Sequence, residues 1–178
     1  VILDIRDQAA VLTALQGIVD DQGRLDLLVN NAGGQFMAGA EDIRPKGWRA
    51  VIDTNLNGTF WVTQAAFQVW MGAHGGSIVS IVAHMWNGFP GMSHTGAARA
   101  AVDNLTKTLS VEWAQHGIRV NAVAPGLILS SGLKTYPLDV LQMLMPMMTQ
   151  MPTARLGTEA EVSAAVVYLL SPATAFTT

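Results

Sequence analysis

Short apolar segments separated by long helical patterns limit this chain to few folds. The segments cover residues 25–30, 77–82 and 118–123. Residues 77–82 form a continuous run with β-branched side chains, which is typical of a strand covered on both faces. Strands that alternate with helices of this length favour a parallel sheet. The sequence therefore predicts an α/β fold with a doubly wound, mostly parallel sheet.

Helical patterns lie before, between and after these segments. Apolar residues recur at helical spacing before Gly23, and Pro45 suits a first helical turn. Ser93 or Thr95 is the expected cap of the third helix. The predicted helices span residues 8–20, 45 to about 74 with an interruption near 55–58, 93 to about 115, and 159–170.

The ends of the three predicted strands carry small and polar residues. Asn30-Asn31, Ala83-His84 and Ala124-Pro125-Gly126 each follow a strand. In open α/β sheets, ligands bind beyond the carboxyl ends of the strands. We therefore expect these residues to meet in one binding site.

Composition excludes several classes of function. The chain has 178 residues, a net charge of −3 and no cysteine. There is no basic stripe for nucleic acid, no run of the ~18 apolar residues that span a bilayer, and no thiol chemistry. We expect a cytoplasmic protein without nucleic-acid or membrane partners, and no metal site. Only 13% of residues are charged, which indicates either a large core or a surface buried against another subunit.

Motifs in order along the whole chain resemble the short-chain dehydrogenase/reductase family. They are Asp4, Asn30-Asn31-Ala32-Gly33, Asn55, Gly76-Ser77-Ile78-Val79, and residues 119–126. Residues 33–36, 46–48 and 94–100 resemble its peroxisomal trans-2-enoyl-CoA reductase branch and bacterial relatives described as citronellol or citronellal dehydrogenases. The resemblance implies a Rossmann-like fold that binds NADP or NAD.

The same resemblance assigns cofactor contacts. It implies that Asp4, with Ile5, meets the adenine; a helix-capping role for Asp4 is the alternative. The remaining contacts are Asn31, Ala32 and Gly33 along the adenosine ribose, and Pro125, Gly126 and Ile128 at the nicotinamide carboxamide; ordinary turns are the alternative for both. The family's glycine-rich loop and its cofactor-selecting residue would precede Val1. We therefore expect residues 1–178 to be a single partial domain, truncated at both ends.

The family's catalytic residues are largely replaced. Its tyrosine, lysine and serine positions read Thr95, Arg99 and Ala83, and only Asn55 matches. Threonine is a poor proton donor at neutral pH. Arg99 keeps a cation that suits ribose hydroxyls or phosphate; an ion pair with Asp103 is the alternative.

His84 and His94 are the candidate hydrogen-bond donors at this site. Each also has a plain interpretation, as a loop histidine bonded to backbone and as a surface histidine at a helix start. Reduction of an enoyl thioester fits the replacements, because its enolate needs a donor at the thioester oxygen rather than a phenol. The alternatives are a dehydrogenase of branched or terpenoid alcohols or aldehydes, and a catalytically silent nucleotide-binding protein.

A methionine-rich segment suggests an apolar substrate. Met143, Met145, Met147, Met148 and Met151 lie within residues 136–151, a region that covers the substrate in the family. Methionine adapts to apolar ligands of variable shape; packing on the core or on a partner is the alternative. The small residues of the helix after Thr95, together with the resemblance, imply a homodimer or homotetramer.

Overall fold

A parallel three-stranded sheet forms the centre of the molecule. The computed structural model describes residues 1–133, 136, 138, 141–142, 146 and 151–178. The strands β1 (Leu27–Asn30), β2 (Gly76–Ile81) and β3 (Ile118–Val123) pair in the order β1-β2-β3. Leu28 lies beside Ile78, which lies beside Val120. The three predicted strands and their parallel pairing are confirmed, with bounds shifted by at most two residues.

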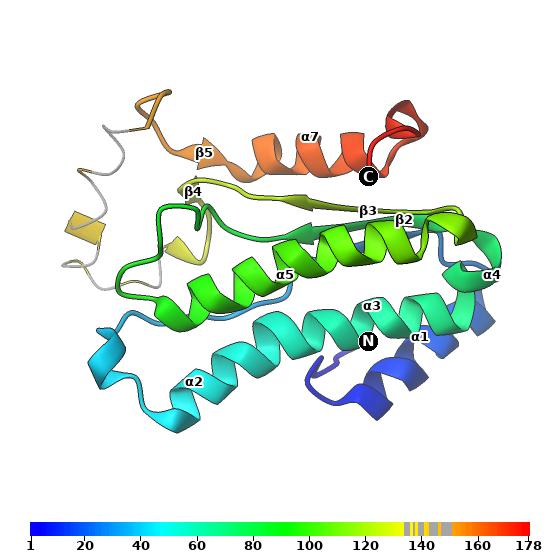
Figure 1. The fold of residues 1–178 in the computed structure, drawn as a ribbon, viewed down its shortest axis with the longest axis horizontal. Helices are drawn as coiled ribbons and strands as arrows, with labels where there is room; N and C mark the ends of the chain where they lie inside the picture. The colour runs from blue at the N-terminus through cyan, green and yellow to red at the C-terminus, as the bar shows by residue number, and fades with distance from the viewer. Residues whose placement is uncertain (134–135, 137, 139–140, 143–145, 147–150) are drawn as a thin grey trace.

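Helices cover both faces of this sheet (Figure 1). Helix α7 (Glu159–Leu170) packs on β2 and β3 from one side. From the other side α3 (Gly58–Ala66) packs on β1 and α5 (Ser93–Glu112) packs on β3, while α1 (Gln8–Gln22) lies against α3. The prediction of a doubly wound sheet is therefore confirmed. In the described part of the chain, no helix is both long and apolar enough to cross a membrane.

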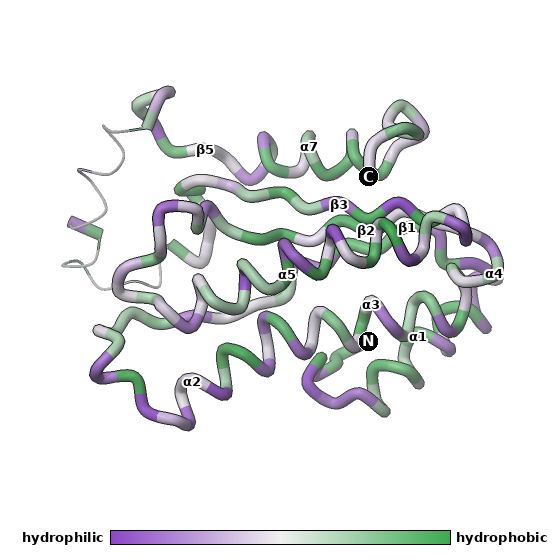
Figure 2. The backbone as a smooth tube through the Cα atoms, in the orientation of Figure 1, coloured by the Kyte–Doolittle hydropathy of each residue, from purple (hydrophilic) through white to green (hydrophobic). Residues whose placement is uncertain are grey.

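The core lies around β2. Ile78 and Val79 are fully buried, because helices cover both sides of this central strand, and Figure 2 shows the hydrophobic character of the strands. Val11, Met71 and Ile118 join Ile78 in one apolar cluster. Burying an aliphatic side chain of this size stabilises the fold by about 1.5–3 kcal/mol.

Residues 45–74 form one long helix with two widened turns. Helix α2 (Pro45–Ile52), which packs against α5, runs into a π-helical turn at Asp53–Asn57. A second π-helical turn, Phe67–Met71, separates α3 from α4 (Gly72–His74). The predicted interruption near 55–58 is thus present, but the helix widens there instead of ending.

Side-chain caps begin α1 and α7, but not α2, α3, α4 or α5. Asp7 accepts from the backbone N–H of Ala10 at the start of α1, and Gly23 ends it with φ 72°. The predicted caps of α5 are wrong, because Met92 is the N-cap residue and provides no side-chain bond. Helix α5 also ends at Glu112, earlier than predicted.

Short elements complete the fold. Turns of 3-10 helix span Ala40–Asp42, Ala114–His116 and Pro172–Thr174. Strands β4 (Ile128–Leu129) and β5 (Gly157–Thr158) form a separate parallel pair. Arg119 in β3 donates to the carbonyl of Leu169 at 2.8 Å, which satisfies a free carbonyl near the end of α7 and ties this helix to the sheet.

Candidate cofactor and substrate site

The loops after β1, β2 and β3 lie together at the carboxyl edge of the sheet (Figure 1). The backbone N–H of Ala38 donates to the carbonyl of Gly91 at 2.8 Å, which joins the first two loops. The N–H of Val82 donates to the carbonyl of Val123 at 2.8 Å, which continues the β2–β3 ladder into the other two. The predicted convergence of the three segments at one edge is confirmed.

Asn30 fixes the end of β1. Its buried amide Nδ2 donates to Thr63 Oγ1 in α3 at 2.8 Å and to Ser80 Oγ in β2 at 3.3 Å. Because a buried amide is costly unless bonded, these partners specify where the strand ends. The residues that follow, from Asn31 to Gly34, are exposed and offer bare backbone to a ligand.

Asn55 holds the turn that follows β1. It projects from the π-helical turn, is 1% exposed, and its Nδ2 donates to the carbonyls of Gly34 at 2.6 Å and Val51 at 2.9 Å. Its Oδ1 accepts from the N–H of Gly34 at 3.3 Å. Both amide hydrogens are therefore committed to backbone, and Asn55 acts here by positioning Gly34.

Arg99 joins the ends of β1 and β2. Its Nη1 donates to the carbonyl of Ile81 at 2.7 Å, and its Nη2 lies so close to Gly33 that a Cβ there would be 2.2 Å away. The alternative of an ion pair with Asp103 is wrong, since Asp103 pairs with Lys107 at 2.7 Å. Burial lowers the pKa of Arg99, but a guanidinium stays charged in proteins. No carboxylate of the described residues pairs with this cation.

His94 is buried rather than on the surface. It is 0% exposed, its Nδ1 accepts from the N–H of Thr95 at 2.7 Å, and its ring meets Phe36 edge-on with centroids 4.4 Å apart. Its Nε2 is buried without a hydrogen-bond partner in the described structure. Burial lowers the pKa of His94 more than the nearby Met92 carbonyl raises it. The interpretation as a surface histidine is therefore wrong.

Thr95 and Ala83 are the residues that the sequence predicts at the family's tyrosine and serine positions. Thr95 is 1% exposed and its Oγ1 lies 3.2 Å from His94 Nδ1, so it does not reach solvent. Ala83 is half-buried and its neighbour His84 is exposed, with its ring 5.4 Å from that of Trp86. Among the described residues no hydrogen bond joins the His84 ring to the backbone, so the interpretation as a loop histidine bonded to backbone is not met here.

The carboxylate of Asp4 forms an ion pair with Arg6. Its carboxylate accepts from Arg6 Nη2 at 2.6 Å and from the Arg6 backbone N–H at 3.0 Å, and these bonds lower the pKa of Asp4 to about 2. Asp7, not Asp4, caps α1, so the capping alternative for Asp4 is wrong. Ile5 is half-buried against Gly58, where a Cβ would lie 2.7 Å from Ile5 Cδ1.

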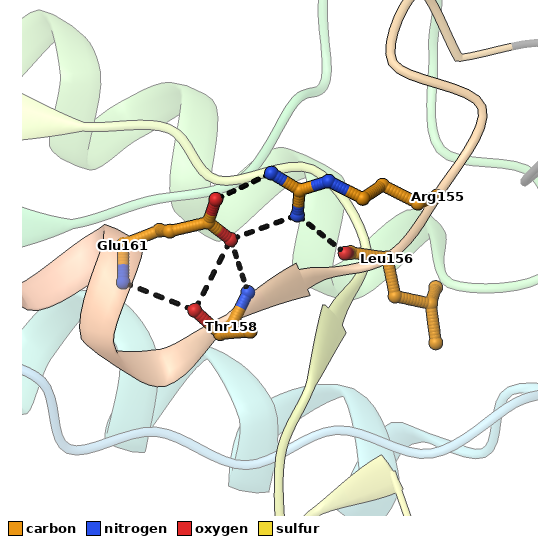
Figure 3. Close-up of polar contacts among 4 residues, drawn as sticks. All are labelled: Arg155, Leu156, Thr158 and Glu161. Atoms are coloured by element: carbon orange, nitrogen blue, oxygen red, sulfur yellow. Dashed lines mark hydrogen bonds and ion pairs between the residues drawn. The ribbon is translucent and has the colours of Figure 1, made fainter.

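The loop after β3 is held by a backbone hydrogen bond from β5. Pro125 and Ile128 are half-buried and Gly126 is exposed, and the Gly157 N–H donates to the carbonyl of Leu127 at 3.0 Å. The chain that leads into α7 is then held by a cluster of polar contacts at the start of this helix (Figure 3).

In this cluster Arg155 Nη1 donates to Glu161 Oε2 at 3.0 Å, and Glu161 and Thr158 form a capping box. Bonds from Arg155 and then Thr158 lower the pKa of Glu161 to about 2. The start of α7 is thereby fixed to Arg155 and Thr158, the residues that lead into it.

Sequence reasoning missed a contact between the loop after β1 and the segment that follows β4. Gln35 Nε2 donates to the Tyr136 hydroxyl at 2.6 Å, across 101 residues. Tyr136 is one of only two tyrosines in the chain, a scarcity that could have singled it out. The prediction that the methionine-rich segment covers the substrate concerns residues outside the described part of the chain, among them Met143, Met145, Met147 and Met148.

A cavity of about 420 Å³ lies beside the start of α5. Phe89 and Met85 line it together with Ser93 and Ala97 of α5. Ala97 lies two residues from Arg99, so the two side chains leave the helix on different sides. The cavity therefore does not contain the Arg99 centre.

The sequence of the chain is similar to those of several known reductases. A family model described as Enoyl-(Acyl carrier protein) reductase matches residues 1–178. The chain is 40% identical over 172 residues to a probable 2,4-dienoyl-CoA reductase of Bacillus subtilis, covering 95% of this chain and 68% of that protein. It is 35% identical over 178 residues to the peroxisomal 2,4-dienoyl-CoA reductase of Pongo abelii, covering 99% and 61%.

Solved structures share the fold. A citronellol catabolism dehydrogenase of Pseudomonas aeruginosa PAO1 is 44% identical with a TM-score of 0.84, covering 97% of this chain and 66% of that one. The NADP-bound structure of ElxO is 32% identical with a TM-score of 0.90, covering 99% and 72%. The chain thus spans about 59–68% of the length of the dienoyl-CoA reductases that it matches.

Proposed function

Because the chain belongs to the Enoyl-(Acyl carrier protein) reductase family of short-chain dehydrogenase/reductases, we propose that its protein reduces an apolar enoyl or dienoyl thioester with NADPH or NADH. The similarity to 2,4-dienoyl-CoA reductases at 40% and 35% identity supports the thioester substrate. The NADP-bound and NAD+-bound relatives of the same fold support the cofactor.

The observation that carries this proposal is the unpaired cation of Arg99. A partly buried charge is costly unless a polar or anionic partner meets it. Its described contacts are the Ile81 carbonyl and the bare backbone at Gly33. A dinucleotide would supply ribose hydroxyls and phosphate beside that backbone, which is the partner that this guanidinium lacks.

The residues along the edge fit a flat dinucleotide. Ala32, Gly33 and Gly34 are exposed, and a Cβ at Gly34 would meet no atom within 4 Å, so the backbone is open to a ligand. Asn31 lies in the same exposed turn, and Pro125, Gly126 and Ile128 face this edge from the loop after β3. Asp4 is 53% exposed, and it would accept from an adenine amino group by exchanging part of its hydrogen bonds to Arg6. The cofactor supplies a hydride when bound.

The two histidines take different parts in this proposal. His84 is exposed at the end of β2 and is free to donate to the thioester oxygen, which stabilises the negative charge that forms there. His94 is enclosed by Phe36 and Thr95 and acts by positioning these neighbours. Asn55 likewise positions Gly34, and Arg99 holds the cofactor.

The test uses the full-length protein with a panel of substrates. Reduced-nicotinamide absorbance is followed with NADPH and then NADH against a medium-chain trans-2-enoyl-CoA, a 2,4-dienoyl-CoA, citronellal and a simple ketone. Consumption with a thioester alone is the expected result. Consumption with citronellal alone would replace the proposal by an aldehyde or alcohol activity. Tight cofactor binding without turnover of any substrate would favour a silent nucleotide-binding protein.

We also propose that the protein is a cytoplasmic homodimer or homotetramer. Helix α5 exposes Ala97 and Ala100, while Ala98 is buried in the core, so two of its small residues remain available for close helix contact. Val111 on the same helix is 78% exposed. Light scattering on the full-length protein should give a multiple of the protomer mass, and a monomer would contradict this assembly.

A further inference from the structure

We propose that the Tyr136 hydroxyl donates the proton that completes the reduction. This inference rests on the proposed function. Addition of hydride to a conjugated thioester leaves an enolate, and a positioned acid is needed to protonate its carbon. The acid should lie at the carboxyl edge of the sheet, close to Arg99, and keep an unshared O–H or N–H.

Three consecutive residues tie Tyr136 to the rest of the site. Gly33 lies against Arg99, Gly34 is held by Asn55, and Gln35 donates to the Tyr136 hydroxyl. Since consecutive Cα atoms are 3.8 Å apart, the Cα atoms of Gly33 and Gln35 lie within about 7.6 Å. The Tyr136 hydroxyl is therefore bonded to the side chain of the third residue in an exposed segment whose first residue lies against Arg99.

The direction of the hydrogen bond leaves the phenol proton free. Gln35 Nε2 donates to the Tyr136 oxygen at 2.6 Å, so the oxygen acts as acceptor in that bond. A tyrosine hydroxyl can accept and donate at the same time. Its own hydrogen is available to a substrate, and the same Gln35 bond then stabilises the negative oxygen that remains after transfer.

Other acids at this edge are less suited to the step. Thr95 is 1% exposed, and the His94 ring is 0% exposed with one nitrogen bonded to backbone. Ser80 is 4% exposed and lies against the Asn30 amide. Tyr136 is half-buried, so its phenolate can recover a proton from solvent.

The reduced nicotinamide would give up the hydride of one C–H bond, and this hydride forms a C–H bond at the β-carbon of an enoyl thioester. The π electrons of the double bond move to the thioester oxygen as an enolate. The Tyr136 O–H bond then breaks, and its proton forms a C–H bond at the α-carbon. The phenolate takes a proton from water. In this scheme His84 donates to the thioester oxygen, while Tyr136 supplies the proton to carbon.

The first experiment compares two Tyr-to-Phe variants of the full-length protein. Tyr136→Phe should lower kcat on the thioester by about 10²–10⁴-fold with little change in KM. Tyr168→Phe is the matched control, because Tyr168 is 59% exposed on α7 and should keep wild-type kinetics. Gln35→Glu, which cannot donate to the phenol, should lower kcat, and Gln35→Ala should lower it less.

A second measurement does not depend on turnover. Tetranitromethane nitrates accessible tyrosines, and peptide mass spectrometry separates the two sites. NADP+ with octanoyl-CoA should protect Tyr136 and leave Tyr168 unprotected. Equal nitration of Tyr136 with and without the thioester would overturn the inference.

The kinetic outcomes separate this inference from the proposed function. Tyr136→Phe with the same kcat as Tyr168→Phe, in a protein that reduces the thioester, would refute the role of Tyr136 alone. A wild-type protein that consumes no reduced nicotinamide with any thioester would refute both.

Discussion

Replacing Gly33 by alanine tests how tightly the site is packed. A Cβ at Gly33 would lie 2.2 Å from Arg99 Nη2 and 2.5 Å from Asn55 Oδ1. Ordinary contact is about 3.5 Å, so the guanidinium must retreat by about 1.3 Å. Arg99 is a flexible side chain, but its Nη1 bond to Ile81 at 2.7 Å would be lost in the movement. Asn55 cannot retreat without breaking its bonds to Gly34.

These contacts set the expected cost. Loss of a charged hydrogen bond costs about 1.5–3 kcal/mol, and overpacking typically costs about 1–3 kcal/mol. Gly33→Ala should therefore lower the free energy of unfolding by about 2–5 kcal/mol, which is roughly 4–20 °C in Tm for a domain of this size. Thermal unfolding of the full-length protein, followed by circular dichroism, measures this difference.

The neighbouring glycine provides the control. A Cβ at Gly34 would meet nothing within 4 Å, so Gly34→Ala should stay within about 0.5 kcal/mol of wild type. In an Arg99→Ala background, Gly33→Ala should cost less, because one of the two clashes is removed. Equal Tm values for Gly33→Ala and Gly34→Ala would show that Arg99 and Asn55 do not pack closely against Gly33.

Three further changes test the electrostatics and the hydrogen bonds. Burial lowers the pKa of His94 from its ordinary value of 6.5. As the pH falls below 6.5 the unfolded chain therefore binds a proton at His94 more readily than the folded protein does, and the free energy of unfolding should decrease. His94→Phe should weaken this pH dependence, measured by urea titrations at pH 7.5 and 5.5. Glu161, with a pKa lowered from 4.5 to about 2, should contribute stability above pH 4.5 that is lost as pH falls toward 2, and Glu161→Gln should show a smaller loss of Tm between those values. Asn55→Ala should cost about 2–4 kcal/mol for its lost bonds, and Asn55→Asp should cost more because a carboxylate then faces the Gly34 carbonyl; a more stable Asp variant in denaturant titrations would contradict this geometry.

The strands and most helices could be predicted because their causes are local. Residues 77–82 are apolar and β-branched, and the central strand β2 (Gly76–Ile81) lies there. Helix α7 has the predicted bounds 159–170, and its start coincides with a capping box of neighbouring residues. Patterns of this kind are set by a few adjacent side chains, which a sequence displays directly.

The site was harder to predict because its contacts join distant residues. Asp103 is one turn from Arg99 and offered an obvious ion pair, but the carbonyl of Ile81 holds the guanidinium instead. His94 replaces a side-chain cap at the start of α5 by taking up the Thr95 N–H. The Gln35–Tyr136 bond has no local signal at all. In each case the folded structure brings one partner within hydrogen-bond distance, and the sequence alone does not distinguish that partner from the other candidates.

The π-helical turn at Asp53–Asn57 also has an evolutionary meaning. A turn of this kind accommodates one residue more than an α-helix would, and successive α-helical residues are rotated by about 100°. Deletion of one residue here would restore a regular α-helix and turn Asn55 away from Gly34, while α3 would still pack on β1. The orientation of the Asn55 amide therefore depends on the number of residues in this turn, so deletion of one residue here would change the site without changing any side chain that contacts Gly34.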